Sequence, residues 1–168
     1  MIILGIDTAI RCTGYGIIRV KENSFEALDC GVIKNSRTIP HSQCLKRLAG
    51  GIRELIANYN IDVAAIEGAF YFKNIKTTMI LGYARGCVMT VLAEADIPAY
   101  AYSPKEVKLS AGGAGTASKQ QVAVIMSSLF GIDISNIEDD ATDALGIALC
   151  HANRSSRSGS DFFMNKPI

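Results

Sequence analysis

The sequence predicts a single α/β domain in which helices pack on a sheet, and three observations support this prediction. The chain begins with an apolar run, Ile2 to Ile6, that is typical of a strand buried on both faces of a sheet. The apolar period changes from that of strands to that of helices near His41, and helix-like and strand-like segments alternate from there on. A chain of 168 residues, 49% of them hydrophobic, is long and apolar enough for one domain with a real core.

The expected elements follow from these periods. Strands are predicted over residues 2–7, 15–20, 25–33, 61–67 and 97–102, and the first three form an antiparallel meander because their connections are short. Helices are predicted over residues 41–59, 75–95, 116–130 and 139–151, with a further helix beginning at Ser103. The glycine-rich stretch 111–115 is expected to be a flexible break. The polar segment 153–168 is expected to be a disordered tail, which leaves 1–152 as the domain.

The helix predicted over residues 75–95 has an unusual surface. Between Met79 and Ala93 only Arg85 and Thr90 are polar, so the helix must be buried on more than one side. One side would pack on the sheet, and the other would be covered by a second subunit or by loops of the chain itself. The small residues that would allow close approach of a second helix are Gly82, Ala84 and Gly86.

Composition narrows the class of protein. The five cysteines are scattered and form no CxxC pair, which is typical of reduced thiols in a cytoplasmic protein rather than of a zinc site or a disulfide framework. We expect neither a signal peptide nor a membrane span, because charged residues interrupt every long apolar window. Because the net charge is only +1, any surface for nucleic acid must come from local segregation of charge.

Four carboxylates stand at positions that suggest chemistry. Asp7 and Glu67 each end an apolar strand, and Asp140 and Asp143 are three residues apart, on one face of the last helix. Burying such charges costs several kcal/mol unless a cation compensates them. Asp7 could instead cap a turn, and the helical pair could complement the positive end of the helix dipole.

If the last helix packs beside the central strands, the four carboxylates converge. All-oxygen ligand sets favour Mg²⁺ or Mn²⁺ over zinc. Two such ions about 4 Å apart activate water and stabilise the leaving oxygen in phosphodiester hydrolysis. The order strand-end Asp, strand-end Glu and helical Asp-x-x-Asp therefore predicts a metal-dependent hydrolase.

Basic and aromatic residues follow these acids in the sequence. The lysines and the arginine that could bind phosphates are Lys73, Lys76, Arg85, Lys105, Lys108 and Lys119. Phe70, Tyr71 and Phe72 are consecutive in a turn and cannot all point inward, so one of them is available to stack on a base. Lys76 and Lys105 could instead be ordinary solvent-exposed lysines with no role in DNA binding.

Several motifs resemble the RuvC family of bacterial Holliday-junction resolvases. They are Gly5-Ile-Asp7, Thr13-Gly-Tyr-Gly16, Ile66-Glu67 with Phe70, Lys73 and Asn74, Leu81-Gly-Tyr-Ala-Arg-Gly86, Val107-Lys108, Ser118-Lys-Gln-Gln-Val122, and Asp140-Ala-Thr-Asp-Ala-Leu145 up to His151. The resemblance implies a ribonuclease H-like fold: a mixed five-stranded sheet with helices on both faces. One departure is Thr8-Ala9, where the family usually has Pro-Gly, which bears on the backbone path after Asp7.

The resemblance also implies roles and partners. Asp7, Glu67, Asp140 and Asp143 would hold two Mg²⁺ ions, for which Mn²⁺ can substitute. Phe70 would contact unstacked bases, and Lys108 and Lys119 would lie near the scissile phosphate. The implied activity is resolution of four-way DNA junctions by a homodimer that makes paired nicks in strands of like polarity. The branch-migration proteins RuvA and RuvB would be its partners in recombination and repair.

Two other functions are compatible with parts of the sequence. Gly-Ile-Asp7 with a later Thr-Gly also resembles the phosphate loop of actin-like ATPases and sugar kinases, which need a duplicated domain for which 168 residues leave no room. A non-catalytic junction-binding relative is the third possibility, and it would have little reason to keep four buried carboxylates.

Overall fold

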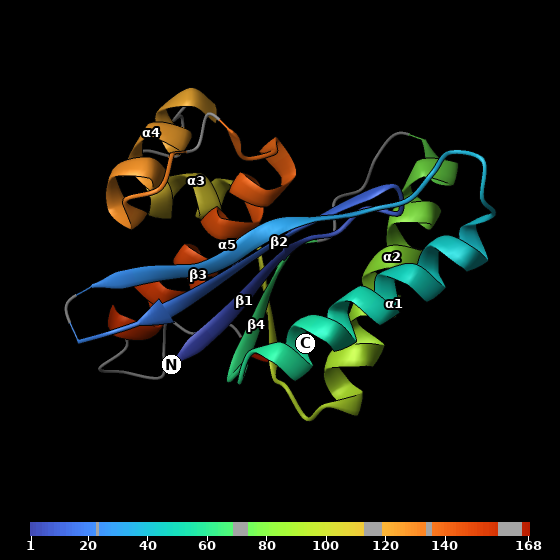
Figure 1. Ribbon diagram of the computed structural model, residues 1–168, viewed down its shortest axis with the longest axis horizontal. Coiled ribbons are helices and arrows are strands. Elements are labelled where there is room, and N and C mark those ends of the chain that lie inside the picture. The colour runs from blue at the N-terminus through green and yellow to red at the C-terminus, as the bar shows by residue number, and fades with distance from the viewer. Residues whose placement is uncertain (23, 69–73, 113–118, 134–135, 158–165) are drawn as a thin grey trace.

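The structure is a computed structural model that describes residues 1–168 except 23, 69–73, 113–118, 134–135 and 158–165. For residues 111–112, 119–120, 122–123 and 156–157 it describes the backbone but not the side chains. Its centre is one five-stranded sheet with the strand order β3-β2-β1-β4-β5 (Figure 1). The strands are β1 (Ile2–Asp7), β2 (Cys12–Val20), β3 (Phe25–Lys34), β4 (Val63–Glu67) and β5 (Ala99–Tyr102). The first three form the predicted antiparallel meander, and β4 and β5 extend the sheet in parallel with β1.

Helices cover both faces of this sheet, as the resemblance implied. They are α1 (His41–Asn58), α2 (Ile75–Glu94), α3 (Pro104–Gly112), α4 (Lys119–Phe130) and α5 (Asp139–Arg157). Helices α1 and α2 pack on one face, whereas α5 lies directly on the other face, with α3 and α4 packed around it (Figure 1). The mixed sheet with helices on both faces is the predicted fold class.

The alternation of side chains along β1 separates two cores. Leu4 and Ile6 point to the face of α1 and α2, and Ile3 points to the face of α5. Because successive side chains of a strand point to opposite faces, Gly5 and Asp7 share the face of Ile3. The carboxylate that ends β1 is therefore directed to the side of the sheet on which α5 lies.

Helix α2 presents two different faces. Ala84, Val88, Val91 and Leu92 are buried against the sheet, so Ala84 does not belong to the outward surface where the sequence analysis placed it. The outward face carries the exposed side chains of Ile75, Met79 and Tyr83, with Gly82 and Gly86 beside them. The side chain of Asn74 caps the helix by accepting a hydrogen bond from the Thr77 backbone N–H at 3.3 Å.

Two expectations about order need correction. Helix α3 continues through Gly112, so the break predicted from residue 111 does not begin there. Helix α5 continues to Arg157, so the disorder predicted from Asn153 is wrong for residues 153–157. Tertiary contacts of Asn153 and Arg154 with α3 explain the extension, because such contacts outweigh weak helix propensity.

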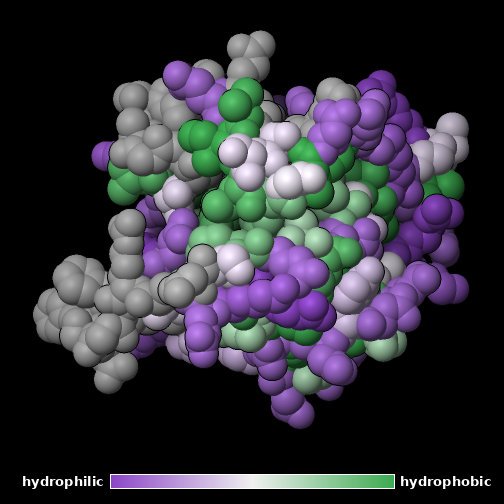
Figure 2. All heavy atoms as spheres, turned by 60° about the vertical axis from the view of Figure 1, so that its left-hand side comes forward, coloured by the Kyte–Doolittle hydropathy of each residue, from purple (hydrophilic) through white to green (hydrophobic). Residues whose placement is uncertain are grey.

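Two observations concern the hydropathy of the molecule. Figure 2 shows one face of the molecule on which hydrophobic side chains gather near the centre and hydrophilic ones surround them. Within the described ranges, no helix combines the length and the hydropathy needed to cross a membrane.

Candidate active site

Asp7 and Glu67 end neighbouring parallel strands at the same level. Ile6 pairs with Ile66 in the register of β1 and β4, and the two acids follow directly. Ala65 packs with the α5 side of the core, so alternation directs Glu67 to that side as well. The carboxyl ends of β1 and β4 thus bring two acids from distant parts of the sequence to one edge of the sheet.

Three glycines allow α5 to lie against the backbone of β1 and β2. A Cβ atom on Gly14 would fall 1.9 Å from the carbonyl oxygen of Asp140, and one on Gly5 would fall 2.1 Å from that of Ala144. Real Cβ atoms do not approach backbone atoms so closely, so any side chain here would displace the helix. Gly16 makes a third such contact, with the backbone of Leu145.

This close approach carries the two helical acids to the strand ends. Gly14 lies over Asp140 on one side and pairs with Asp7 in the sheet on the other. Asp143 lies one turn further along α5, on the same helix face. The sequence predicted the pair Asp140 and Asp143 on one face, and the structure places that face at the end of the sheet where Asp7 lies.

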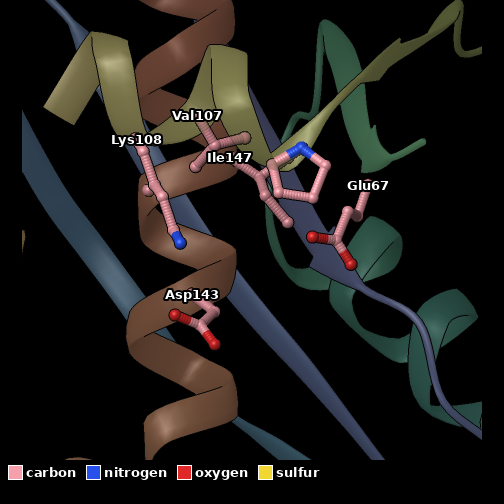
Figure 3. Close-up of a pocket in the computed structure, with 7 residues that line it drawn as sticks. Glu67, Val107, Lys108, Asp143 and Ile147 are labelled. Carbon is pink, nitrogen blue, oxygen red and sulfur yellow. The ribbon is translucent and has the colours of Figure 1, made fainter. Parts of the chain in front are cut away.

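A pocket with a volume of about 150 Å³ opens between β4, α3 and α5. Figure 3 shows Lys108 extending from α3 toward Asp143, while the carboxylate of Glu67 faces the pocket from the opposite side. The lining residues are Glu67, Pro104, Val107, Lys108, Asp143, Gly146 and Ile147. Two of the four predicted carboxylates and one of the predicted lysines therefore line the same cavity.

The donor set fits a hard divalent cation, because it consists of carboxylates only. Among the residues that the structure describes, however, no three His, Cys, Asp or Glu side chains stand close enough together to hold a metal ion. Like charges repel one another, and a divalent cation relieves that repulsion. The backbone thus gathers the four acids at one end of the sheet, and their side chains would have to close around an ion.

Asp140 has a neighbour that the sequence analysis did not connect with the site. Burial, and after it the nearby Asp140 carboxylate, raises the pKa of the Cys12 thiol to about 12. Lys34, which pairs with Cys12 in the sheet, binds Glu138 with an N–O distance of 2.6 Å. These contacts come from strands β2 and β3 and hold the beginning of α5 at the sheet.

The loop after Asp7 is held by a side chain. The hydroxyl of Thr13 donates to the carbonyl oxygen of Ala9 at 2.5 Å and accepts from the Ala9 N–H at 3.3 Å. Thr13 is 1% exposed, so this bridge is shielded from water. The loop between β1 and β2 is therefore held by hydrogen bonds even though it carries Thr8-Ala9 in place of the Pro-Gly that is usual in the resembled family.

Arg85 has a structural role that differs from the predicted phosphate contact. Its guanidinium donates a hydrogen bond to the backbone carbonyl oxygen of Glu67, and burial lowers its pKa. Arg85 thus ties α2 to the end of β4 and fixes the backbone from which the Glu67 side chain projects.

Comparison with known proteins decides the family. The model of the family described as crossover junction endodeoxyribonuclease RuvC matches residues 3–151. The RuvC protein of Chlorobaculum parvum is 38% identical over 154 residues, which cover 92% of this chain and 82% of that protein. The RuvC protein of Clostridioides difficile is 39% identical over 153 residues, covering 91% and 90%.

The chain belongs to the RuvC family of crossover junction endodeoxyribonucleases. A solved structure agrees with this assignment: RuvC of T. thermophilus in complex with Holliday junction substrate matches with a TM-score of 0.90 at 30% identity, covering 100% of this chain and 99% of that one. The resemblance stated from the motifs is thereby confirmed, and so is the fold it implied.

Three residues that the RuvC resemblance singled out lie beyond the description. Phe70 and Lys73 fall within residues 69–73, which are outside the described residues. Lys119 begins α4, and its side chain is also outside the description. Their roles remain predictions. The close packing of α5 on Gly5, Gly14 and Gly16 could not be predicted from the sequence, since a glycine in a strand is informative only when the crossing helix is known.

Proposed function

We propose that this RuvC-family chain is a structure-selective endonuclease that resolves four-way DNA junctions by paired nicks in strands of like polarity. The observation that carries the proposal is the pocket lined by Glu67, Asp143 and Lys108, at the end of the sheet where Asp7 and Asp140 also lie. Acids at this position, together with a cation for the phosphate, match the chemistry of phosphodiester hydrolysis.

The four carboxylates would hold two Mg²⁺ ions, for which Mn²⁺ can substitute. When bound, such ions activate water and stabilise the charge on the leaving oxygen. Lys108, which points into the pocket, would bind the scissile phosphate and stabilise the charge that develops on it. The shielded bridge between Thr13 and Ala9 would keep the Asp7 loop in place while the strand enters.

DNA binding is assigned to Lys108 and to three further residues of the RuvC motifs. Lys73 and Lys119 join Lys108 as proposed phosphate contacts, and Phe70 is the proposed stacking partner of an unpaired base. In the sequence, Phe70 and Lys73 come three and six residues after the end of β4, whose last residue, Glu67, lines the pocket, and Lys119 is the first residue of α4. The functions of these residues are strand positioning and phosphate contact.

A homodimer is part of the proposal. Ile75, Met79 and Tyr83 are spaced by four residues and form an exposed apolar stripe on α2, with exposed fractions of 66%, 53% and 47%. A Cβ atom on Gly82 or Gly86 would meet nothing within 4 Å, so a second backbone could approach here. A two-fold axis at this stripe would supply two identical sites, as two nicks require.

The cellular setting completes the proposal. RuvA and RuvB, which move junction branch points, are the proposed protein partners, and no membrane is involved. A cytoplasmic location is supported by the five cysteines, which are present as free thiols, as expected in a reducing compartment.

The proposal is tested by incubating the protein with a synthetic four-way junction and Mg²⁺, and in parallel with ATP. We expect symmetric nicks in two strands of like polarity and no ATP hydrolysis. A linear duplex of the same sequence is the matched control and should remain uncut. Hydrolysis of ATP without nicking would favour the actin-like ATPase alternative, and junction binding without nicking in Mg²⁺ or Mn²⁺ would favour the non-catalytic relative.

A further inference from the structure

Helix α3 carries the pocket lysine on one side and a second set of polar residues on the other. Pro104, Val107 and Lys108, spaced three and four residues apart, line the pocket. Glu106 and Ser110, one helical turn apart, face the end of α5 instead. Because a residue turns about 100° around a helix, Lys108 and Glu106 lie roughly 200° apart.

The second side of α3 is fastened to the last turns of α5. The guanidinium of Arg154 forms an ion pair with Glu106, and the side-chain amide of Asn153 donates to the hydroxyl of Ser110 at 3.0 Å. Arg154 also lies over the ring of Tyr102, with 5.9 Å between its Cζ atom and the ring centroid. We name the four residues Glu106, Ser110, Asn153 and Arg154 the α3–α5 clasp.

Glu106 joins this clasp to the start of α3. One of its carboxylate oxygens accepts hydrogen bonds from the backbone N–H and the hydroxyl of Ser103, at 2.8 and 2.7 Å, and the other binds Arg154. The Ser103 hydroxyl in turn accepts from the Glu106 N–H at 3.3 Å. Glu106 and Arg154 are each one-third exposed, so water screens this pair less than it screens an ion pair on the open surface.

We propose that the α3–α5 clasp positions Lys108 over the carboxylates of the pocket, so that Arg154 and Asn153 are positioning residues for strand cleavage. The inference rests on the proposed nuclease function. On the pocket side, Val107 packs against α5 and lies 3.4 Å from where a Cβ atom on Gly146 would be, an apolar contact that sets the distance between the helices but has no polar partner to fix the rotation of α3 about its axis. The clasp, on the other side of α3, prevents that rotation.

The clasp explains why helix α5 continues beyond His151. Only its first turns carry the acids of the site, yet its last turns hold Asn153 and Arg154 opposite α3. A single helix therefore presents Asp143 to the pocket and, three turns later, fastens the helix that brings Lys108 to the same pocket. The relative position of the acid and the lysine is thus fixed by one rigid element.

The test measures cleavage of a four-way junction in a single turnover with enzyme in excess, and junction binding separately. Arg154→Ala and Asn153→Ala should each cut more slowly, by roughly 10- to 100-fold for Arg154→Ala, because a misplacement of about 1 Å costs that much. Junction affinity should stay within about twofold of wild type. Thermal unfolding and circular dichroism identify a variant that fails to fold, and the two variants remove different contacts of the clasp.

A double-mutant cycle separates positioning from general loss of structure. In a Lys108→Ala background, Arg154→Ala should cause no further loss, since it acts through the lysine that is already gone. The matched control is Arg53→Ala, which removes an ion pair of 2.8 Å to Glu94 between α1 and α2, on the other face of the sheet, and should cut at the wild-type rate.

Several results would overturn the inference while leaving the nuclease function intact. One is cleavage at the wild-type rate by both Arg154→Ala and Asn153→Ala. A second is a double variant, Lys108→Ala with Arg154→Ala, whose loss of cleavage rate equals the product of the two single losses. A third is cleavage at the wild-type rate by Lys108→Ala itself. Failure of the wild-type protein to nick any junction would instead overturn the proposed function.

Discussion

Gly14 and Asp140 are in backbone contact: a Cβ atom on the glycine would lie 1.9 Å from the carbonyl oxygen of the aspartate. Gly14 also pairs with Asp7 in the sheet. Gly14, which has no side chain, therefore lies between two of the four acids of the proposed site, Asp7 and Asp140. The distance between the strand acid and the helical acid depends on the absence of a single methyl group.

The first prediction concerns that methyl group. Gly14→Ala should push the first turn of α5 away from β2, lower the free energy of unfolding by about 2 kcal/mol or more, and reduce junction cleavage at temperatures where the protein remains folded. Gly50→Ala in α1 is the control, because a Cβ atom there meets nothing within 4 Å. It should stabilise the protein by up to about 1 kcal/mol and leave cleavage unchanged. Equal stability and equal cleavage of the two variants would mean that α5 adjusts freely.

The second prediction concerns the outward face of α2. Met79→Asp or Tyr83→Asp should yield a folded monomer that nicks one strand of a cruciform plasmid at a time, so that nicked circles replace linear product. Sedimentation reports the mass, and circular dichroism reports folding. Met89 contacts the core of the α1–α2 face, so Met89→Asp should instead unfold the domain. A wild-type protein that sediments as a monomer even on a junction would refute this use of α2.

The third prediction concerns His151, which is 2% exposed and whose Nδ1 shares a hydrogen bond of 2.8 Å with the Tyr102 hydroxyl. Burial lowers the pKa of His151 from 6.5 to about 4 in the folded protein. Between these two pH values the unfolded chain binds a proton that the folded chain does not. The contribution of His151 to stability is therefore complete above about pH 6.5 and is lost as the pH falls toward 4, on the order of 3 kcal/mol in all.

His151→Asn checks this sign, because asparagine can form a hydrogen bond with the Tyr102 hydroxyl in either direction and does not titrate. Urea unfolding from pH 7 to 4.5 should show a smaller decline in the free energy of unfolding for this variant than for wild type. If the free energy of unfolding declined equally in both proteins, a group other than His151 would be responsible for the pH dependence.

The fourth prediction concerns Phe70 and Lys119. Phe70→Ala should lower the cleavage rate more than junction affinity, because stacking on an unpaired base positions the strand. Lys119→Ala should likewise slow the chemical step more than binding, since a cation near the phosphate stabilises developing charge. Lys76→Ala, at an exposed lysine near the start of α2, is the comparison and should affect binding slightly and chemistry little. Parallel losses of affinity and rate would reduce Phe70 and Lys119 to general DNA contacts.

Much of the fold could be predicted from the sequence because its signals are local. The apolar runs that end at Asp7 and Glu67 indicated buried strands, and the buried face of α1 follows the predicted helical period. The pairing of the two strand ends in one sheet was implied by the family resemblance, and their register is visible only in the structure.

The remaining features depend on contacts between distant segments. Arg-Ser-Ser-Arg after Asn153 has the composition of a tail, yet it is helical to Arg157 because Asn153 and Arg154 contact α3. Arg85 resembled a DNA contact in the sequence and instead binds the backbone at Glu67. Cys12 and Asp140 are neighbours in the structure although they stand 128 positions apart in the sequence, and no local pattern predicts such a pair.

The most direct measurement is single-turnover cleavage of a four-way junction in Mg²⁺ by Asp7→Asn, Glu67→Gln, Asp140→Asn and Asp143→Asn, with junction binding measured beside it. These substitutions keep the size of each side chain and remove its charge. We predict that each lowers the cleavage rate by roughly a hundredfold or more while affinity for the junction persists, because hydrolysis requires the carboxylates and binding does not. Cleavage at nearly the wild-type rate by any one variant would remove that residue from the site, and such cleavage by all four would contradict the account of the pocket as the active site.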